Sequence, residues 1–107
     1  MSSDHHSEYL ARAIAALTPE GHARVDELLE GLAQVVGNRE WLARFAQTRR
    51  AEADSGRLAP APDAGLTEDD IGALLAGFKT IRDTEQLDDV TDWANAVVAL
   101  LQDEAEA

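Results

Sequence analysis

The sequence contains no cysteine, and only 5% of its residues are aromatic. The lack of cysteine excludes disulfides, thiol nucleophiles and zinc sites built on cysteine. Because aromatic side chains are scarce, we expect a core made mainly of Leu, Val, Ile and Ala. The chain also lacks an apolar run of about 18 residues, the length that a membrane-spanning helix needs. Its first residues contain no apolar segment of the kind found in secretory signals, so we expect a cytoplasmic protein with no membrane partner.

Positive charge is scarce as well. The 107 residues include 21 Asp and Glu against 9 Lys and Arg, which gives a formal net charge of −12. Residues 59–107 hold twelve of these acids against only Lys79 and Arg82. A surface this negative is repelled by phosphate backbones and anionic membranes, so direct nucleic-acid binding is not expected. The single lysine against eight arginines, together with many alanines, suggests a bacterial origin.

Apolar residues recur every three or four positions along the chain, a spacing typical of amphipathic helices. We predict one all-α domain over residues 1–107, folded as a small antiparallel bundle of four to five helices. Residues 1–7 are polar and are predicted to be a disordered tail, with Ser7 capping the first helix. Residues 55–66 contain two prolines. We therefore predict a non-helical linker between helices 3 and 4.

Residue types that cap helices mark several predicted helix starts. Thr18 is followed by proline and an acid, and Asn38 follows a glycine. Thr67 precedes three acids, of which Asp70 stands where the acid of a capping box belongs. A hydroxyl or amide side chain at such a position accepts a hydrogen bond from an unpaired amide of the first helical turn. We predict Thr84 as the cap of the last helix.

Two helix faces bear on how other helices pack. The stripe of the second predicted helix, which runs to Val36, includes Leu28, Leu32 and Val35, and we expect it to be buried. The side of the fourth helix opposite its apolar stripe carries small residues, namely Gly72, Ala73, Ala76, Gly77 and Thr80. Either these residues let another helix approach closely, or they are short side chains facing solvent.

The third predicted helix, Arg39 to about Ala53, loses its apolar face after two turns. The face begins with Trp41 and Phe45 but then meets Arg49. We therefore predict that the second half of this helix extends past the core into solvent or toward a partner. The basic residues predicted to bind there are Arg44, Arg49 and Arg50.

The last predicted helix offers a second candidate surface. Glu85, Asp88 and Asp92 follow i, i+3, i+7 spacing, which would align their carboxylates along one side. Trp93 and Leu100 lie at the margin of the apolar stripe. They are either peripheral core or anchors for a partner, since a Trp at an interface often contributes much of the binding energy.

The chain lacks the motifs of common catalytic and metal sites. No G-x-S-x-G turn, glycine-rich phosphate loop or calcium-binding loop is present. Asp4, His5, His6 and Glu8 lie at a polar terminus without the surrounding structure that orients metal ligands. His22 is the remaining histidine. We predict no catalytic residue, metal or cofactor.

These observations favour a non-enzymatic protein-interaction module, an accessory or adaptor subunit that docks on a larger protein partner or self-associates. In the self-associating version, the basic end of the third helix meets the acidic row of another copy. An alternative is an acidic mimic of DNA that inhibits a nuclease or another nucleic-acid-binding protein. A small enzyme or a metal-binding bundle is the third alternative.

Overall fold

The computed structural model of the chain describes residues 2–55 and 65–106, with side chains over 8–51, 54 and 65–102. The described residues form five α-helices and no strand. In chain order these are α1 (Ser2–Ala16), α2 (Pro19–Val35), α3 (Arg39–Ser55), α4 (Glu68–Thr84) and α5 (Asp88–Glu106). They pack into one body with extents of 32 × 29 × 22 Å. The predicted all-α helical bundle is confirmed.

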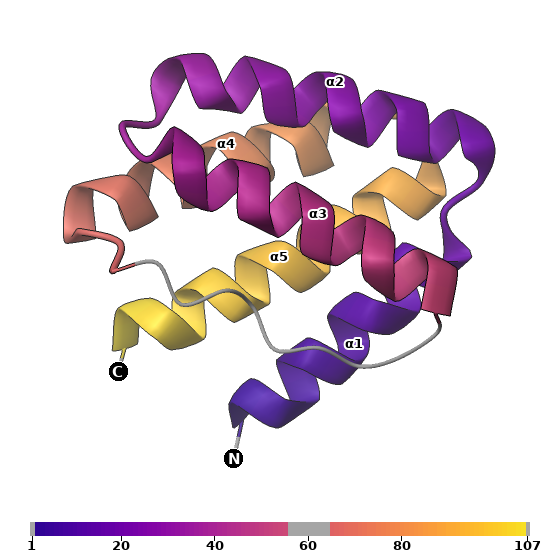
Figure 1. Ribbon diagram of the computed structural model, residues 1–107, viewed down its shortest axis with the longest axis horizontal. Helices are drawn as coiled ribbons and strands as arrows, with labels where there is room; N and C mark the ends of the chain where they lie inside the picture. The colour runs from indigo at the N-terminus through magenta and orange to yellow at the C-terminus, as the bar shows by residue number, and fades with distance from the viewer. Residues whose placement is uncertain (1, 56–64, 107) are drawn as a thin grey trace.

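Helix α5 occupies the interior of the bundle and contacts α1, α2 and α4. The pairs α2–α3 and α4–α5 run antiparallel, and α2 also lies against α4 (Figure 1). Helix α3 ends and α4 begins at opposite ends of the molecule (Figure 1). Of the predicted linker over residues 55–66, Ser55 belongs to α3, Gly65 and Leu66 are non-helical, and residues 56–64 lie outside the described residues.

Three predicted caps are present in the structure. The Thr18 hydroxyl accepts from the Gly21 amide at 3.0 Å, with proline at the first position of α2. The Asn38 side chain accepts from the amide of Trp41 at 3.0 Å. Thr67 and Asp70 form the predicted capping box of α4. These local signals therefore set the starts of α2, α3 and α4.

Two predicted boundaries are wrong. Helix α1 begins at Ser2 and not at Ser7, so residues 2–7 are not a disordered tail. Serine and aspartate, which occupy residues 2–4, are residue types that suit the first turn of a helix. Thr84 does not cap α5: it is the last residue of α4, and its hydroxyl donates to the Thr80 carbonyl at 2.7 Å.

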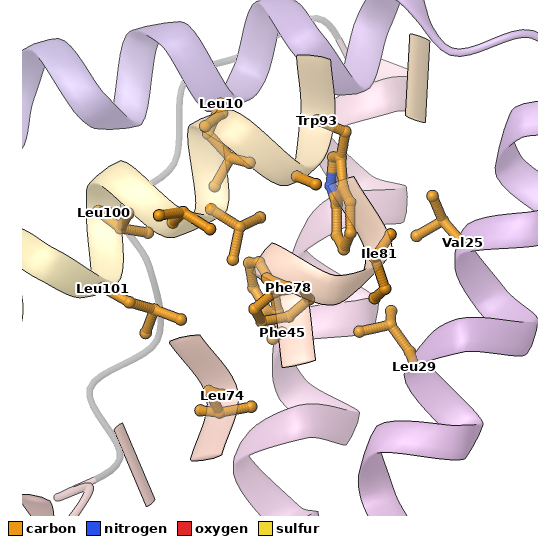
Figure 2. Close-up of a cluster of buried hydrophobic side chains, with 14 of the residues drawn as sticks. Leu10, Val25, Leu29, Phe45, Leu74, Phe78, Ile81, Trp93, Leu100 and Leu101 are labelled. Atoms are coloured by element: carbon orange, nitrogen blue, oxygen red, sulfur yellow. The ribbon is translucent and has the colours of Figure 1, made fainter. Parts of the chain in front are cut away.

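The core is centred on aromatic side chains, although these are few. Phe45 from α3, Phe78 from α4 and Trp93 from α5 meet with ring centroids 5.3–6.4 Å apart, and Trp41 stacks on Phe45 at 5.0 Å. Leucine, valine and isoleucine side chains from several helices surround them (Figure 2). Most core residues are therefore aliphatic, as expected, but the aromatic rings occupy the centre of the core.

Asp89 of α5 ties that helix to the start of α2. Its carboxylate accepts from the Thr18 amide at 2.8 Å and from the Thr18 hydroxyl at 3.1 Å. A Cβ atom at Gly21 would overlap this carboxylate, so the close approach requires glycine there. Burial by itself would raise the pKa of Asp89, but hydrogen bonds from Thr18, together with those from the backbone amides of Asp89 and Val90, outweigh burial and lower it below its ordinary value.

We expect Asp89→Asn to lower the free energy of unfolding by about 1 kcal/mol at neutral pH, because the charge-assisted bonds are lost. A carboxyl whose pKa is depressed by folding stabilises the protein above its unfolded pKa, and this stabilisation is lost as pH falls through the folded pKa. The difference between variant and wild type should therefore shrink below about pH 4. Urea denaturation at a series of pH values measures it. A difference that stays constant down to about pH 3 would contradict the electrostatic cause.

Candidate functional site

Trp93 and Leu100, predicted as candidate partner anchors, lie inside the protein. Their exposed fractions are 0% and 4%. They stand at the margin of the α5 stripe, but α1, α2 and α4 together cover much more of this helix than one stripe. The prediction that these two side chains contact a partner is therefore corrected: both belong to the core.

The predicted acidic row does not form, because Glu85 is not part of α5. It follows the last residue of α4, and its carboxylate accepts from Nε and Nη2 of Arg24 at 2.9 and 2.7 Å. This ion pair lowers the pKa of Glu85. Asp88 and Asp92 are exposed one turn apart at the start of α5. Two carboxylates of the predicted row of three therefore share a helix face.

Arg49, predicted to project toward a partner, has a fully buried side chain. Its Nη1 lies 2.8 Å from Nδ1 of His22, and its Nη2 donates to the carboxylate of Asp26. Burial lowers the pKa of Arg49, whereas the Asp26 charge opposes this shift. The prediction for Arg49 is wrong because α1 and α2 pack against α3, and Asp26 of α2 supplies the counter-charge that a buried guanidinium requires.

The other two predicted basic residues are exposed, and of these two only Arg50 forms an ion pair with a described residue. Nη2 of Arg50 donates to the second oxygen of Asp26 at 3.0 Å. Arg44 lies on the exposed face of α3, two turns before Arg50. The structure thus gathers Arg49 and Arg50 around Asp26 and leaves Arg44 apart, so the predicted basic end is smaller than expected.

A hollow of about 250 Å³ lies beside this ion pair. It is lined by His22, Asp26, Arg49, Arg50 and Asp54. Both oxygens of Asp26 already accept from arginines, and the lining contains no serine, threonine or lysine nucleophile. The arrangement therefore fits a structural ion pair better than an acid–base site.

Metal binding has no support in the described part of the chain, where no group of three His, Asp or Glu side chains is placed to hold an ion. The side chains of Asp4, His5 and His6, considered from the sequence, lie outside the described residues.

An apolar depression of about 540 Å³ lies between α2 and α4. We call it the α2–α4 groove. Val35 is 75% exposed on its wall, and Leu28 is half-buried. The residues that line the groove are Arg24, Glu27, Leu28, Gly31, Leu32, Val35, Ala73, Ala76, Gly77, Thr80 and Ile81.

The floor of the groove is a close contact between its two helices. A Cβ atom at Gly77 of α4 would overlap the Leu32 side chain of α2, so the helices touch here because residue 77 is glycine. Above the floor, Gly31 and Ala76 carry little or no side chain, and no atom lies within 4 Å of the place where a Cβ of Gly31 would be. The walls therefore meet at the bottom and leave space at the top.

An ion pair closes one end of the groove. Arg24 contacts Glu85 at 2.7 Å and Glu27 at 3.1 Å. These two carboxylates raise the pKa of Arg24. Arg24, the one cation among the described residues that line the groove, therefore already has two anionic partners.

No family model, curated protein or solved structure matches the chain. Among the described helices, none combines the length and the apolarity needed to cross a lipid bilayer. The geometry of this chain is therefore what indicates a functional site.

The sequence pointed to the α4 wall of this groove but not to the exposed α2 wall. For the small residues of α4 the sequence left two alternatives, a close helix approach or short side chains facing solvent. Leu32 of α2 makes the close approach at Gly77, whereas Gly72, Ala76 and Thr80 are exposed. Val35 was predicted to be buried with its stripe, and this is wrong. It stands on the side of α2 that faces outward beside α4, whereas Leu32 and Val36 face the core. Periodicity identifies an apolar face, but not which part of it a neighbouring helix covers.

Proposed function

We propose that the protein is a non-enzymatic interaction module, an accessory or adaptor protein of the bacterial cytoplasm, which docks a helix of a partner protein in the α2–α4 groove. The observation that carries this proposal is the 540 Å³ apolar groove with Val35 exposed on a chain whose net charge is −12. Exposed apolar surface that is grouped in one depression marks a binding site more often than scattered apolar residues do.

The shape of the groove supports a helix as the occupant. Two neighbouring antiparallel helices form a channel into which the side chains of a third helix can insert. Leu28, Gly31 and Val35 line the α2 wall at i, i+3, i+7, and Ala73, Ala76 and Thr80 follow the same spacing on α4. A partner helix with apolar residues at matching intervals would bury both walls.

The other functions considered from the sequence have less support. Self-association through a basic end now depends on Arg44, since Arg49 is buried and Arg50 is paired with Asp26. DNA mimicry would use the acidic face of the last helix, where Asp88 and Asp92 are exposed, but Glu85 lies outside α5 and pairs with Arg24. Asp88 and Asp92 are exposed and stay as predicted contacts for a partner.

The proposal is tested by a pair of substitutions at adjacent exposed residues of α2. Val35→Glu places a carboxylate in the groove, whereas Gln34→Glu makes the same change in side-chain charge outside it. Both sites are exposed, so each variant should keep the stability of the wild type within about 0.5 kcal/mol. Immobilised Gln34→Glu should retain the same partner from an extract of the native host as the wild type, and Val35→Glu should lose about 90% of it. If Val35→Glu retains the same proteins in the same amounts, the groove is not the binding site.

A further inference from the structure

We propose that the occupant of the α2–α4 groove is a basic amphipathic helix, with an apolar ridge along one face and Lys or Arg on both sides of it. This inference rests on the proposed function and adds the chemistry of the partner. Two observations support it: the apolar lining of the groove, and the excess of carboxylates along its margins.

The margins carry more negative than positive charge at both ends. On α4, Asp69 lies one turn before Ala73, and Asp83 lies nearly one turn after Thr80, so both continue the wall of the groove. On α2, Glu27 lines the groove and Glu20 lies two turns before it on the same helix. Lys79 is the cation beside this wall, one turn after Ala76.

The one cation inside the groove does not offset these acids for a ligand. Arg24 is held by Glu27 and Glu85, so its charge is already balanced by two carboxylates. Asp83 is exposed and contacts Nε of Arg82 at 3.2 Å, and Glu27 already contacts Arg24. With these pairs counted, acids still outnumber cations around the apolar floor: the acids are Glu20, Glu27, Asp69, Asp83 and Glu85, and the cations are Arg24, Lys79 and Arg82. Such a rim attracts cationic side chains and repels anionic ones.

Charge also argues against a second copy of this chain as the occupant. Each copy has a net charge of −12, so two copies repel one another over most of their surfaces. The amphipathic helix closest in form to a ligand, α5, begins with two acids, and its apolar side chains between Val90 and Leu101 are buried apart from the half-buried Ala99. A cationic partner is complementary both to the groove margins and to the whole molecule.

The test uses three synthetic helical peptides of about 18 residues, long enough to span the 17-residue helices of the groove. All share leucines at i, i+3, i+7 spacing, and their flanking positions carry Lys, Gln or Glu. Fluorescence anisotropy with the full chain measures each affinity. We expect the Lys peptide to bind about ten-fold more tightly than the Gln peptide at low salt. This advantage should shrink at high salt because the charges are screened.

The adjacent variants separate the groove from general charge attraction. Val35→Glu should weaken Lys-peptide binding by about five-fold or more although it makes the protein more negative. Gln34→Glu should leave binding unchanged or strengthen it slightly. The double variant Asp69→Asn/Asp83→Asn should reduce the preference for Lys over Gln by several-fold and leave Gln-peptide binding unchanged.

Several results would overturn the inference. Equal or tighter binding of the Gln or Glu peptide, lost on Val35→Glu, would show that the groove binds helices without selecting cations. Lys-peptide binding that is insensitive to Val35→Glu would place the cationic contact elsewhere on the acidic surface. If no peptide binds but host-partner capture still depends on Val35, the inference fails while the proposed function stands. If Val35→Glu captures the host partner as well as the wild type does, the proposed function itself is contradicted.

Discussion

Asp26→Ala is expected to lower the free energy of unfolding by about 2–4 kcal/mol, because it leaves the buried Arg49 guanidinium without its counter-charge. Arg49 has no exposed side-chain area, and its other polar contact is with Nδ1 of His22 at 2.8 Å, which supplies no carboxylate charge. Its Nε is also buried without a hydrogen-bond partner among the described residues. Asp26 is itself partly exposed, which places the expected loss toward the lower part of the range.

Replacing the guanidinium by an apolar side chain of similar length should have a much smaller effect. Arg49→Met removes the charge that needs Asp26 and keeps the packing between α2 and α3, so we expect a change within about 1 kcal/mol of the wild type. Adding Arg49→Met to Asp26→Ala should restore most of the lost stability. This non-additivity is the signature of a buried charge pair.

Urea denaturation followed by circular dichroism measures all of these variants. Arg50→Ala is the matched control, because it removes an exposed arginine bound to the same carboxylate and should cost less than about 1 kcal/mol. A strictly additive double variant, or an Asp26→Ala cost no larger than that of the control, would contradict the account of Arg49.

Trp93→Ala should lower the free energy of unfolding by about 3–5 kcal/mol, since it empties the largest fully buried side-chain site. The indole ring contacts Phe45 of α3 and Phe78 of α4, so its loss removes the centre of the contact between three helices. Trp93→Phe should cost about 2 kcal/mol or less, because the remaining ring keeps part of the packing. It also removes the indole N–H, which is buried with no partner among the described residues.

Circular dichroism is the suitable probe here, because the substitution removes one of the two tryptophans on which fluorescence would depend. Tyr9→Ala is the control: Tyr9 is 49% exposed, and its loss should cost less than about 1 kcal/mol. A Trp93→Ala cost below about 1 kcal/mol would mean that Trp93 is not part of a close-packed core. The partner-anchor role first considered for Trp93 would then return.

The starts of α2, α3 and α4 could be predicted from the sequence because they depend on groups a few residues apart. Thr18, Asn38 and Thr67 each bond to an amide three positions later, and such short-range geometry is the same in any bundle. The end of α4 could not be predicted as well, because a threonine such as Thr84 is equally common as the cap of a following helix and in the last turn of a helix. Its hydroxyl bonds back to Thr80, which no spacing rule distinguishes from capping.

The candidate site depends on contacts between residues far apart in the chain. Arg24 pairs with Glu85 across 61 positions, and Arg49 pairs with Asp26 across 23. The position of each of these charged residues in the sequence is equally typical of an exposed residue, so the sequence does not predict which of them are buried. Each helix contacts more than one other helix. The positions of these neighbouring helices determine that Arg49 is buried and that Val35 is exposed.

The sequence by itself determined an all-helical chain, the caps of three helices and the excess of acids, because these depend on composition and on neighbours within one helical turn. Only the tertiary structure decided that Trp93 and Arg49 are enclosed and that Val35 borders an open groove. A helix has one apolar face but several possible neighbours. The packing of the five helices against one another selects which part of each face is covered, and that selection leaves the α2–α4 groove open.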